Sequence, residues 1–178
     1  MFQPQVEKLL NEQIVHETYS ANLYLSMSAW LRDKNLDGYA NWFYVQYKEE
    51  MNHALIFYNF ILNAGGRVLL GAIDAPPQEF DSLADILDKS YEHEQFVTSL
   101  IYNIADAATK AKDFKTLQFL DWFIQEQVEE EDNASTNIGR LKNFGGDARG
   151  LHSLDQEAGT RAYVLTPQLA LYEPGGGA

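Results

Sequence analysis

The sequence of 178 residues contains no cysteine. This absence excludes disulfide bonds, iron–sulfur clusters, thiolate zinc sites and a cysteine nucleophile, so any bound metal ion must have oxygen or imidazole ligands. No apolar run approaches the ~18 residues of a transmembrane helix. Residues 1–10 also lack the basic and apolar regions of a secretory signal. We therefore expect a soluble, cytoplasmic protein with no membrane partner.

Basic residues are scarce, with 13 Lys and Arg against 26 Asp and Glu, which gives a formal net charge of −13. A protein that neutralises phosphates needs the opposite sign, so we expect no nucleic-acid partner. Hydrophobic residues make up 46% of the chain and aromatic residues 13%, enough to form a core and to argue against disorder. The length predicts a single domain over residues 1–178.

Only five prolines occur, and they leave residues 5–75 and 78–166 free of proline, which favours long helices. Gly65 and Gly66 are typical of a helix end, whereas Ser82 followed by Asp85 resembles a capping box at a helix start. With the turn residues elsewhere, these signals predict helices at about 6–34, 39–64, 82–111, 114–143 and 147–163, and a flexible tail at 173–178.

Each of the four long helices has a row of positions spaced alternately three and four residues apart, which is the spacing of helices packed at small crossing angles. Short connections join the first helix to the second and the third to the fourth, so each pair forms an antiparallel hairpin. The long segment 65–81 can run the length of the bundle. The predicted fold is all-α: a four-helix bundle over about 6–143 with one long crossover and a short fifth helix.

Five acidic or imidazole side chains lie near the middle of these rows, where a buried charge needs a partner or a metal ion. They are Glu17, Glu50, His53, Glu94 and Glu130. Three polar pairs share an offset of 77 residues, which relates the two hairpins: Glu17 and Glu94, Glu50 and Gln127, His53 and Glu130. Hairpins packed with pseudo-twofold symmetry would bring these side chains together at mid-bundle.

Glu50 and His53 are three residues apart on one helix face, so both can bind one ion while Glu17 approaches from the neighbouring helix. Glu94 and Glu130 would complete a second position, and Glu50 could bridge the two. Carboxylate and imidazole ligands suit iron, manganese or zinc. The pattern predicts a dinuclear metal centre with Gln127 beside it. The plain alternatives are surface carboxylates or a hydrogen-bonded core network without metal.

The chain resembles the bacterial-type non-haem ferritins from about residue 6 to residue 164. Four stretches carry this resemblance: His16-Glu17-x6-Tyr24, Glu49-Glu50-Met51-Asn52-His53-Ala54, His93-Glu94, and Gln125-Glu126-Gln127-Val128-Glu129-Glu130-Glu131. It implies a ferritin-like fold in which Glu17, Glu50 and His53 bind a first iron. Glu50, Glu94 and Glu130 bind a second, and Gln127 lies next to it. The family's third, weaker iron site would use Glu49, Glu126, Glu129 and Glu130.

The resemblance also implies roles for aromatic residues and for the whole assembly. Tyr24 is similar to the family's tyrosine beside the di-iron centre, an electron donor or protector against partly reduced oxygen, and Trp122 could assist it; a packing role is the plain alternative. The implied function is a ferroxidase that oxidises Fe(II) with O2 or H2O2 and stores Fe(III) inside a homo-oligomeric shell of 24 chains. Met51 stands where bacterioferritins carry a haem ligand. Because the fourth helix has Gln127-x-x-Glu130 in place of their second Glu-x-x-His, we expect no haem.

Three other classes share parts of this pattern. A rubrerythrin-type peroxidase or another di-iron oxidoreductase would use a similar bundle, but rubrerythrins usually add a cysteine-containing segment that this chain lacks. A DNA-protecting mini-ferritin normally has no fifth helix. A purely structural bundle would be expected to place Leu or Ile at the five acidic and imidazole positions.

Overall fold

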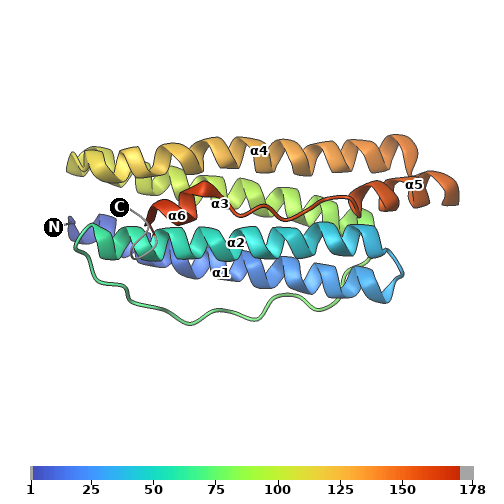
Figure 1. Ribbon diagram of the computed structural model, residues 1–178, viewed down its shortest axis with the longest axis horizontal. Coiled ribbons are helices and arrows are strands. Elements are labelled where there is room, and N and C mark those ends of the chain that lie inside the picture. The colour runs from blue at the N-terminus through green and yellow to red at the C-terminus, as the bar shows by residue number, and fades with distance from the viewer. Residues whose placement is uncertain (1, 173–178) are drawn as a thin grey trace.

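The computed structural model of the protein describes residues 2–172, which form four long helices and two short ones. In chain order they are α1 (Pro4–Asp33), α2 (Asp37–Asn63), α3 (Leu83–Ala111), α4 (Phe114–Phe144), α5 (Ala148–Ala158) and α6 (Pro167–Tyr172). The four long helices lie side by side in a bundle, α1 paired with α2 and α3 with α4 (Figure 1). The predicted four-helix bundle is confirmed. Within the described residues, no helix is both long and apolar enough to cross a membrane.

The helix boundaries follow local signals in the sequence. Pro4 occupies the first turn of α1, where its missing N–H costs no hydrogen bond. Ser82 caps α3 by accepting a hydrogen bond from the Asp85 backbone N–H at 3.1 Å, as the sequence predicts. Asp113 caps α4 in the same way. Gly65, which follows α2, has φ of +78°, a backbone conformation that glycine adopts without steric cost.

The long crossover between α2 and α3 runs back along α1 and is tied to it at both ends (Figure 1). At its start, Asn11 donates to the Arg67 carbonyl at 3.0 Å and accepts from the Leu69 N–H at 2.6 Å. Near its end, the Ser26 hydroxyl donates to the Pro77 carbonyl at 2.5 Å. Because Asn11 and Ser26 are about four turns apart on α1, the crossover spans much of the bundle and makes α2 and α3 parallel.

The C-terminal region departs from the prediction. The fifth helix was expected over about 147–163, but α5 ends at Ala158. Gly159 weakens the helix there, and the side chains of Arg161 and Tyr163, which follow the helix, contact α2. The sequence analysis also missed α6, a six-residue helix whose Leu169 enters the core. The predicted flexible tail at 173–178 lies outside the described residues.

The core consists of two apolar clusters with a polar layer between them. One cluster lies around Leu10, Phe57 and Phe123, and the other around Met27 and Phe43. The layer between them contains buried polar and charged side chains from all four long helices, among them Gln13, Glu17, Gln46, Glu50, His53, Glu94, Gln127 and Glu130. Burying so many polar groups opposes folding unless they have partners or a ligand.

Candidate metal centre

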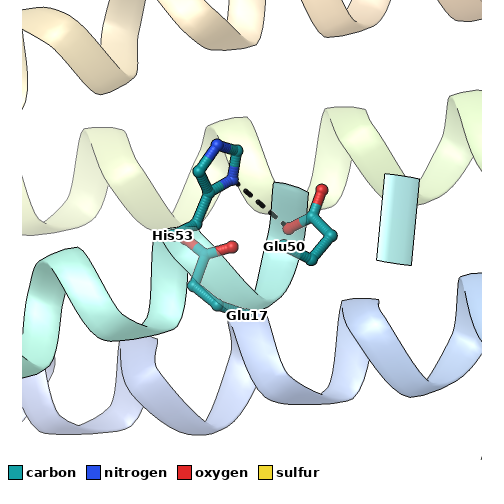
Figure 2. A group of neighbouring side chains, drawn as sticks. All are labelled: Glu17, Glu50 and His53. Atoms are coloured by element: carbon teal, nitrogen blue, oxygen red, sulfur yellow. Dashed lines mark ion pairs between the residues drawn. The ribbon is translucent and has the colours of Figure 1, made fainter. Parts of the chain in front are cut away.

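Glu17 from α1 and Glu50 and His53 from α2 converge inside the bundle (Figure 2). Each offers one ligand atom, and these atoms lie within 4.8 Å of one another, which is close enough for all three to bind a single ion. His53 Nδ1 is 3.5 Å from Glu50 Oε2. The three residues are only 1–3% exposed. The structure therefore brings together the three side chains predicted for the first metal position.

Glu94 from α3 and Glu130 from α4 belong to the other hairpin, and both are buried, but their oxygens are not part of the group of ligand atoms that lie within 4.8 Å of one another. Their negative charges act on Glu50, which shows that the carboxylates of the two hairpins share one electrostatic environment. Gln127 donates from Nε2 to the Glu94 side chain and to the Glu94 carbonyl, each at 3.2 Å. Gln127 therefore lies next to Glu94 and orients its carboxylate; its predicted place beside a second iron stays a prediction.

Two glutamines support the acidic side chains, and the sequence analysis gave neither a role. Gln13 Nε2 donates to Glu17 Oε1 at 2.9 Å, and Gln46 Nε2 donates to Glu130 Oε2 at 2.9 Å. Gln13 precedes Glu17 by four residues, and Gln46 precedes Glu50 by the same interval. This repeated spacing on adjacent helices could have identified the two glutamines from the sequence. It would not have identified the partner of Gln46, because Gln46 contacts Glu130 of α4 and not Glu50.

The carboxyl groups of the site resist ionisation in the absence of a cation. Burial, followed by the neighbouring charge of Glu50, raises the pKa of Glu17 to about 8. Burial and the charge of Glu130 raise the pKa of Glu94 to about 8. The pKa of Glu50 lies well above its usual range because of burial and the charges of Glu94 and Glu130. These carboxyls hold protons near neutral pH, and a bound cation would replace those protons.

Buried oxygen atoms without a hydrogen-bond partner indicate whether these side chains could bind a metal ion. Among the described residues, Glu17 Oε2 and Gln46 Oε1 are buried oxygens without a hydrogen-bond partner. A buried carboxylate oxygen without a partner is costly for a structural network, but a metal ligand needs a free lone pair. Four carboxylates and one imidazole are the ligand types that suit Fe(II), Mn(II) or Zn(II). The donor types present fit divalent ions, and Glu17, Glu50 and His53 lie close enough together to bind one.

Aromatic side chains border the centre. The Tyr24 hydroxyl donates a hydrogen bond to Glu94 Oε1, and Tyr24 is fully buried. Burial, together with the charge of Glu94, raises the pKa of Tyr24 well above its usual range, so the phenol stays protonated. Trp122 packs edge-on against His53, with ring centroids 5.5 Å apart. The aromatic residues predicted to assist the centre thus contact residues of the polar layer.

The residues predicted for a third metal position are less tightly assembled. Glu126 Oε1 lies 4.0 Å from His53 Nε2. Burial, against the lowering effect of Arg161 and with a smaller contribution from the charges of Glu130 and Glu126, raises the pKa of Glu49 to about 7. Glu129 is exposed on α4. Glu49 is also bound by Arg161, whose Nη2 lies 2.6 Å from Glu49 Oε2. The sequence analysis did not anticipate this contact.

Comparisons with known proteins agree with this geometry. Residues 7–144 match the family model described as the ferritin-like domain. The chain is 38% identical to a bacterial non-heme ferritin of Staphylococcus saprophyticus over 92% of this chain and 98% of the relative. It is 39% identical to one of Campylobacter jejuni over 88% and 93%. An open-pore ferritin structure from Archaeoglobus fulgidus has a TM-score of 0.89 at 41% identity, covering 91% of this chain and all of the other.

Proposed function

Because this chain belongs to the ferritin family, we propose that it oxidises Fe(II) at its buried carboxylate centre and stores the Fe(III) product. Iron storage is the function that family membership and the non-haem ferritin relatives support. The names of these relatives do not state the oxidation step, the residues that perform it or the size of the assembly, so these three points are part of the proposal. The oxidation step and its residues are argued from the side chains of the polar layer, and the assembly is argued from the family.

Two Fe(II) ions are the proposed substrates. Glu17, Glu50 and His53 bind the first ion, and Glu50, Glu94 and Glu130 bind the second, so that Glu50 serves both. Dioxygen accepts one electron from each ion and two protons, giving two Fe(III) and one H2O2. Hard anionic oxygen ligands favour the more highly charged product. Iron is chosen over manganese or zinc because storage as an oxide requires this change of oxidation state.

The observation that carries the proposal is the set of buried carboxyls that have no cationic side chain to balance their charges once they ionise. Glu17, Glu50 and Glu94 are at most 2% exposed, and among the described residues no Lys or Arg forms an ion pair with them. A hydrogen-bonded structural core would be more stable with apolar side chains at these positions. Two divalent cations supply the missing positive charge.

The storage function needs a closed space for the oxidised iron, which one bundle does not provide. We propose a shell of 24 chains, the assembly typical of the family, with α5 packing between subunits. An acidic chain of net charge −13 would attract cations to such a shell. Glu49, Glu126, Glu129 and Glu130 are the proposed ligands of a third, weaker iron position next to the pair.

Size-exclusion chromatography with light scattering, after aerobic loading with Fe(II), tests this function. A 24-chain shell of 20.2-kDa chains would have a mass of about 485 kDa. Such a particle, co-eluting with far more than three iron ions per chain, would support storage. A dimer or another small species that holds about two iron ions per chain would contradict it. That result would indicate a di-iron oxidoreductase instead.

A further inference from the structure

The segment that follows α5 returns along the bundle as an extended strap, defined here as residues 159–166. In Figure 1 the strap runs between α2 and α4 toward α6. It is fixed at both ends. Before it, the buried Asp155 accepts a hydrogen bond from the Tyr39 N–H at 2.9 Å. After it, Leu169 is buried in the core. The strap is therefore held against the face where α2 and α4 meet.

Two side chains of the strap contact α2 along one stripe. The Arg161 guanidinium lies over the Trp42 ring, 4.2 Å from its centroid, and Asn41 donates to the Arg161 carbonyl at 2.9 Å. About three turns further along α2, Asn52 donates to the Tyr163 hydroxyl at 2.5 Å. The Arg161 side chain is only 17% exposed. Stacking on Trp42 and the backbone contact hold the guanidinium in one position, independently of its contact with a carboxylate.

Glu49 is the carboxylate that Arg161 binds, at 2.6 Å, and the Glu49 side chain is 22% exposed. Glu49 also lies within electrostatic range of Glu130, His53 and Glu126. No other Lys or Arg of residues 2–172 forms an ion pair with this group. Arg161 therefore supplies a fixed positive charge at one edge of an acidic cluster that adjoins the metal centre.

We propose that Arg161 limits each chain to two tightly bound metal ions by occupying the Glu49 carboxylate that a third ion would need. The inference rests on the proposed function, since it requires the two-ion centre. A cation fixed by the strap competes with a divalent ion for the same oxygen and repels it as well. A third ion binds well only when Arg161 leaves Glu49, which requires the strap to lose its stacking on Trp42.

Titration calorimetry of the assembled protein with Co(II) tests the proposal. The titration is done without O2, so that Co(II) is not oxidised and only metal binding is measured. We expect the wild type to bind two Co(II) per chain tightly. Arg161→Gln should bind a third at least tenfold more tightly than the wild type does. Arg161→Lys keeps the charge but loses the guanidinium stacking on Trp42, so its affinity for a third ion should lie between those of the wild type and Arg161→Gln. Adding Glu49→Gln to Arg161→Gln should weaken the third ion again.

Arg140→Gln is the matched control, because Arg140 pairs with Glu157 and does not contact the acidic cluster. It should bind two ions as the wild type does. Equal third-ion affinity in the wild type and Arg161→Gln would overturn the role of Arg161 while leaving the two-ion centre intact. If neither the wild type nor any of these variants binds two ions tightly, the proposed function is wrong, and the inference is overturned with it.

Amide hydrogen exchange of the wild-type protein provides a second test. It needs no variant, so it does not depend on whether a variant folds. With two Co(II) per chain, the strap amides should exchange as slowly as in the metal-free protein. Excess Co(II) that forces a third ion into the site should accelerate exchange at residues 160–163. A third ion that binds while exchange in the strap stays unchanged would contradict the proposal.

Discussion

The Tyr24 hydroxyl donates a hydrogen bond to Glu94 Oε1 inside the bundle, where both side chains are at most 2% exposed. The contact joins an oxidisable phenol on α1 to a proposed ligand of the second iron on α3. Removing the hydroxyl leaves every proposed ligand in place. Tyr24 can therefore be tested separately from metal binding.

Tyr24→Phe should leave the first oxidation step within about twofold of the wild type but change the decay of the oxidised di-iron species. The reason is that phenylalanine can neither donate an electron readily nor hydrogen-bond Glu94. Stopped-flow absorbance after mixing with O2 measures both phases. Tyr19→Phe is the control, because Tyr19 lies against His93 and makes no hydrogen bond to Glu94. Unchanged decay in Tyr24→Phe would make Tyr24 a packing residue.

Glu94→Gln should slow Fe(II) oxidation by at least tenfold while preserving the fold. The substitution keeps the size of the side chain but removes the negative charge that holds the second iron. Burial raises the pKa of Glu94 to about 8, so the neutral amide should also stabilise the metal-free protein above that pH. Oxidation rates and thermal unfolding at pH 9 measure the two effects.

Glu92→Gln is the matched control for this change, since Glu92 is exposed on the same helix two residues away. It should leave both oxidation and stability close to the wild type. If Glu94→Gln oxidises two Fe(II) per chain at the wild-type rate, Glu94 is not a ligand of the second iron.

Much of the fold could be predicted because the spacing of apolar residues by three and four positions persists through four long helices. The candidate metal-binding residues could be predicted for a physical reason as well. Glu and His are costly at core positions, so Glu17, Glu50 and His53 stand out among apolar neighbours. The structure confirms that these three lie within reach of one ion. Their binding of metal stays a prediction, as do the roles of Glu94, Glu130 and the third-site residues.

The C-terminal region could not be predicted from local pattern. Six residues are too few to form a stable helix alone, and α6 depends on Leu169 and Tyr172 packing against a distant part of the core. The early end of α5 has a similar origin, because Arg161 reaches Glu49, 112 residues away in the chain. Such contacts between distant segments leave no periodicity in the sequence.

Gly38→Ala should detach α5 from the start of α2. A Cβ at Gly38 would lie 1.6 Å from the Asp155 carbonyl oxygen, which is backbone and cannot move aside. We expect a loss of about 1–3 kcal/mol in the free energy of unfolding, the usual range for overpacking, together with weaker shell assembly. Gly139→Ala on α4 meets no atom within 4 Å and should stabilise the helix by about 0.5–1 kcal/mol. Equal stability of the two variants would contradict close packing of α5 on α2.

The buried carboxyls also predict how the stability of the metal-free protein depends on pH. Glu17 and Glu94 have pKa values of about 8 in the folded chain against 4.5 for an unperturbed glutamate. As the pH rises from 4.5 to 8, the unfolded chain loses these protons before the folded chain does. Their contribution to stability is therefore full below pH 4.5 and is lost by the time the pH passes 8.

Calorimetric unfolding between pH 5 and pH 9 should show the metal-free melting temperature falling, and Glu17→Gln/Glu94→Gln should fall less steeply. Divalent ions reverse the effect, because they bind the ionised carboxylates and displace the protons. The rise in melting temperature on adding Zn(II) should thus be larger at pH 8 than at pH 6. Titrations in two buffers of different ionisation enthalpy should detect the released protons at pH 6.5. A metal-free melting temperature that rises toward pH 8, or metal binding without proton release, would show that these carboxyls are already ionised in the folded chain.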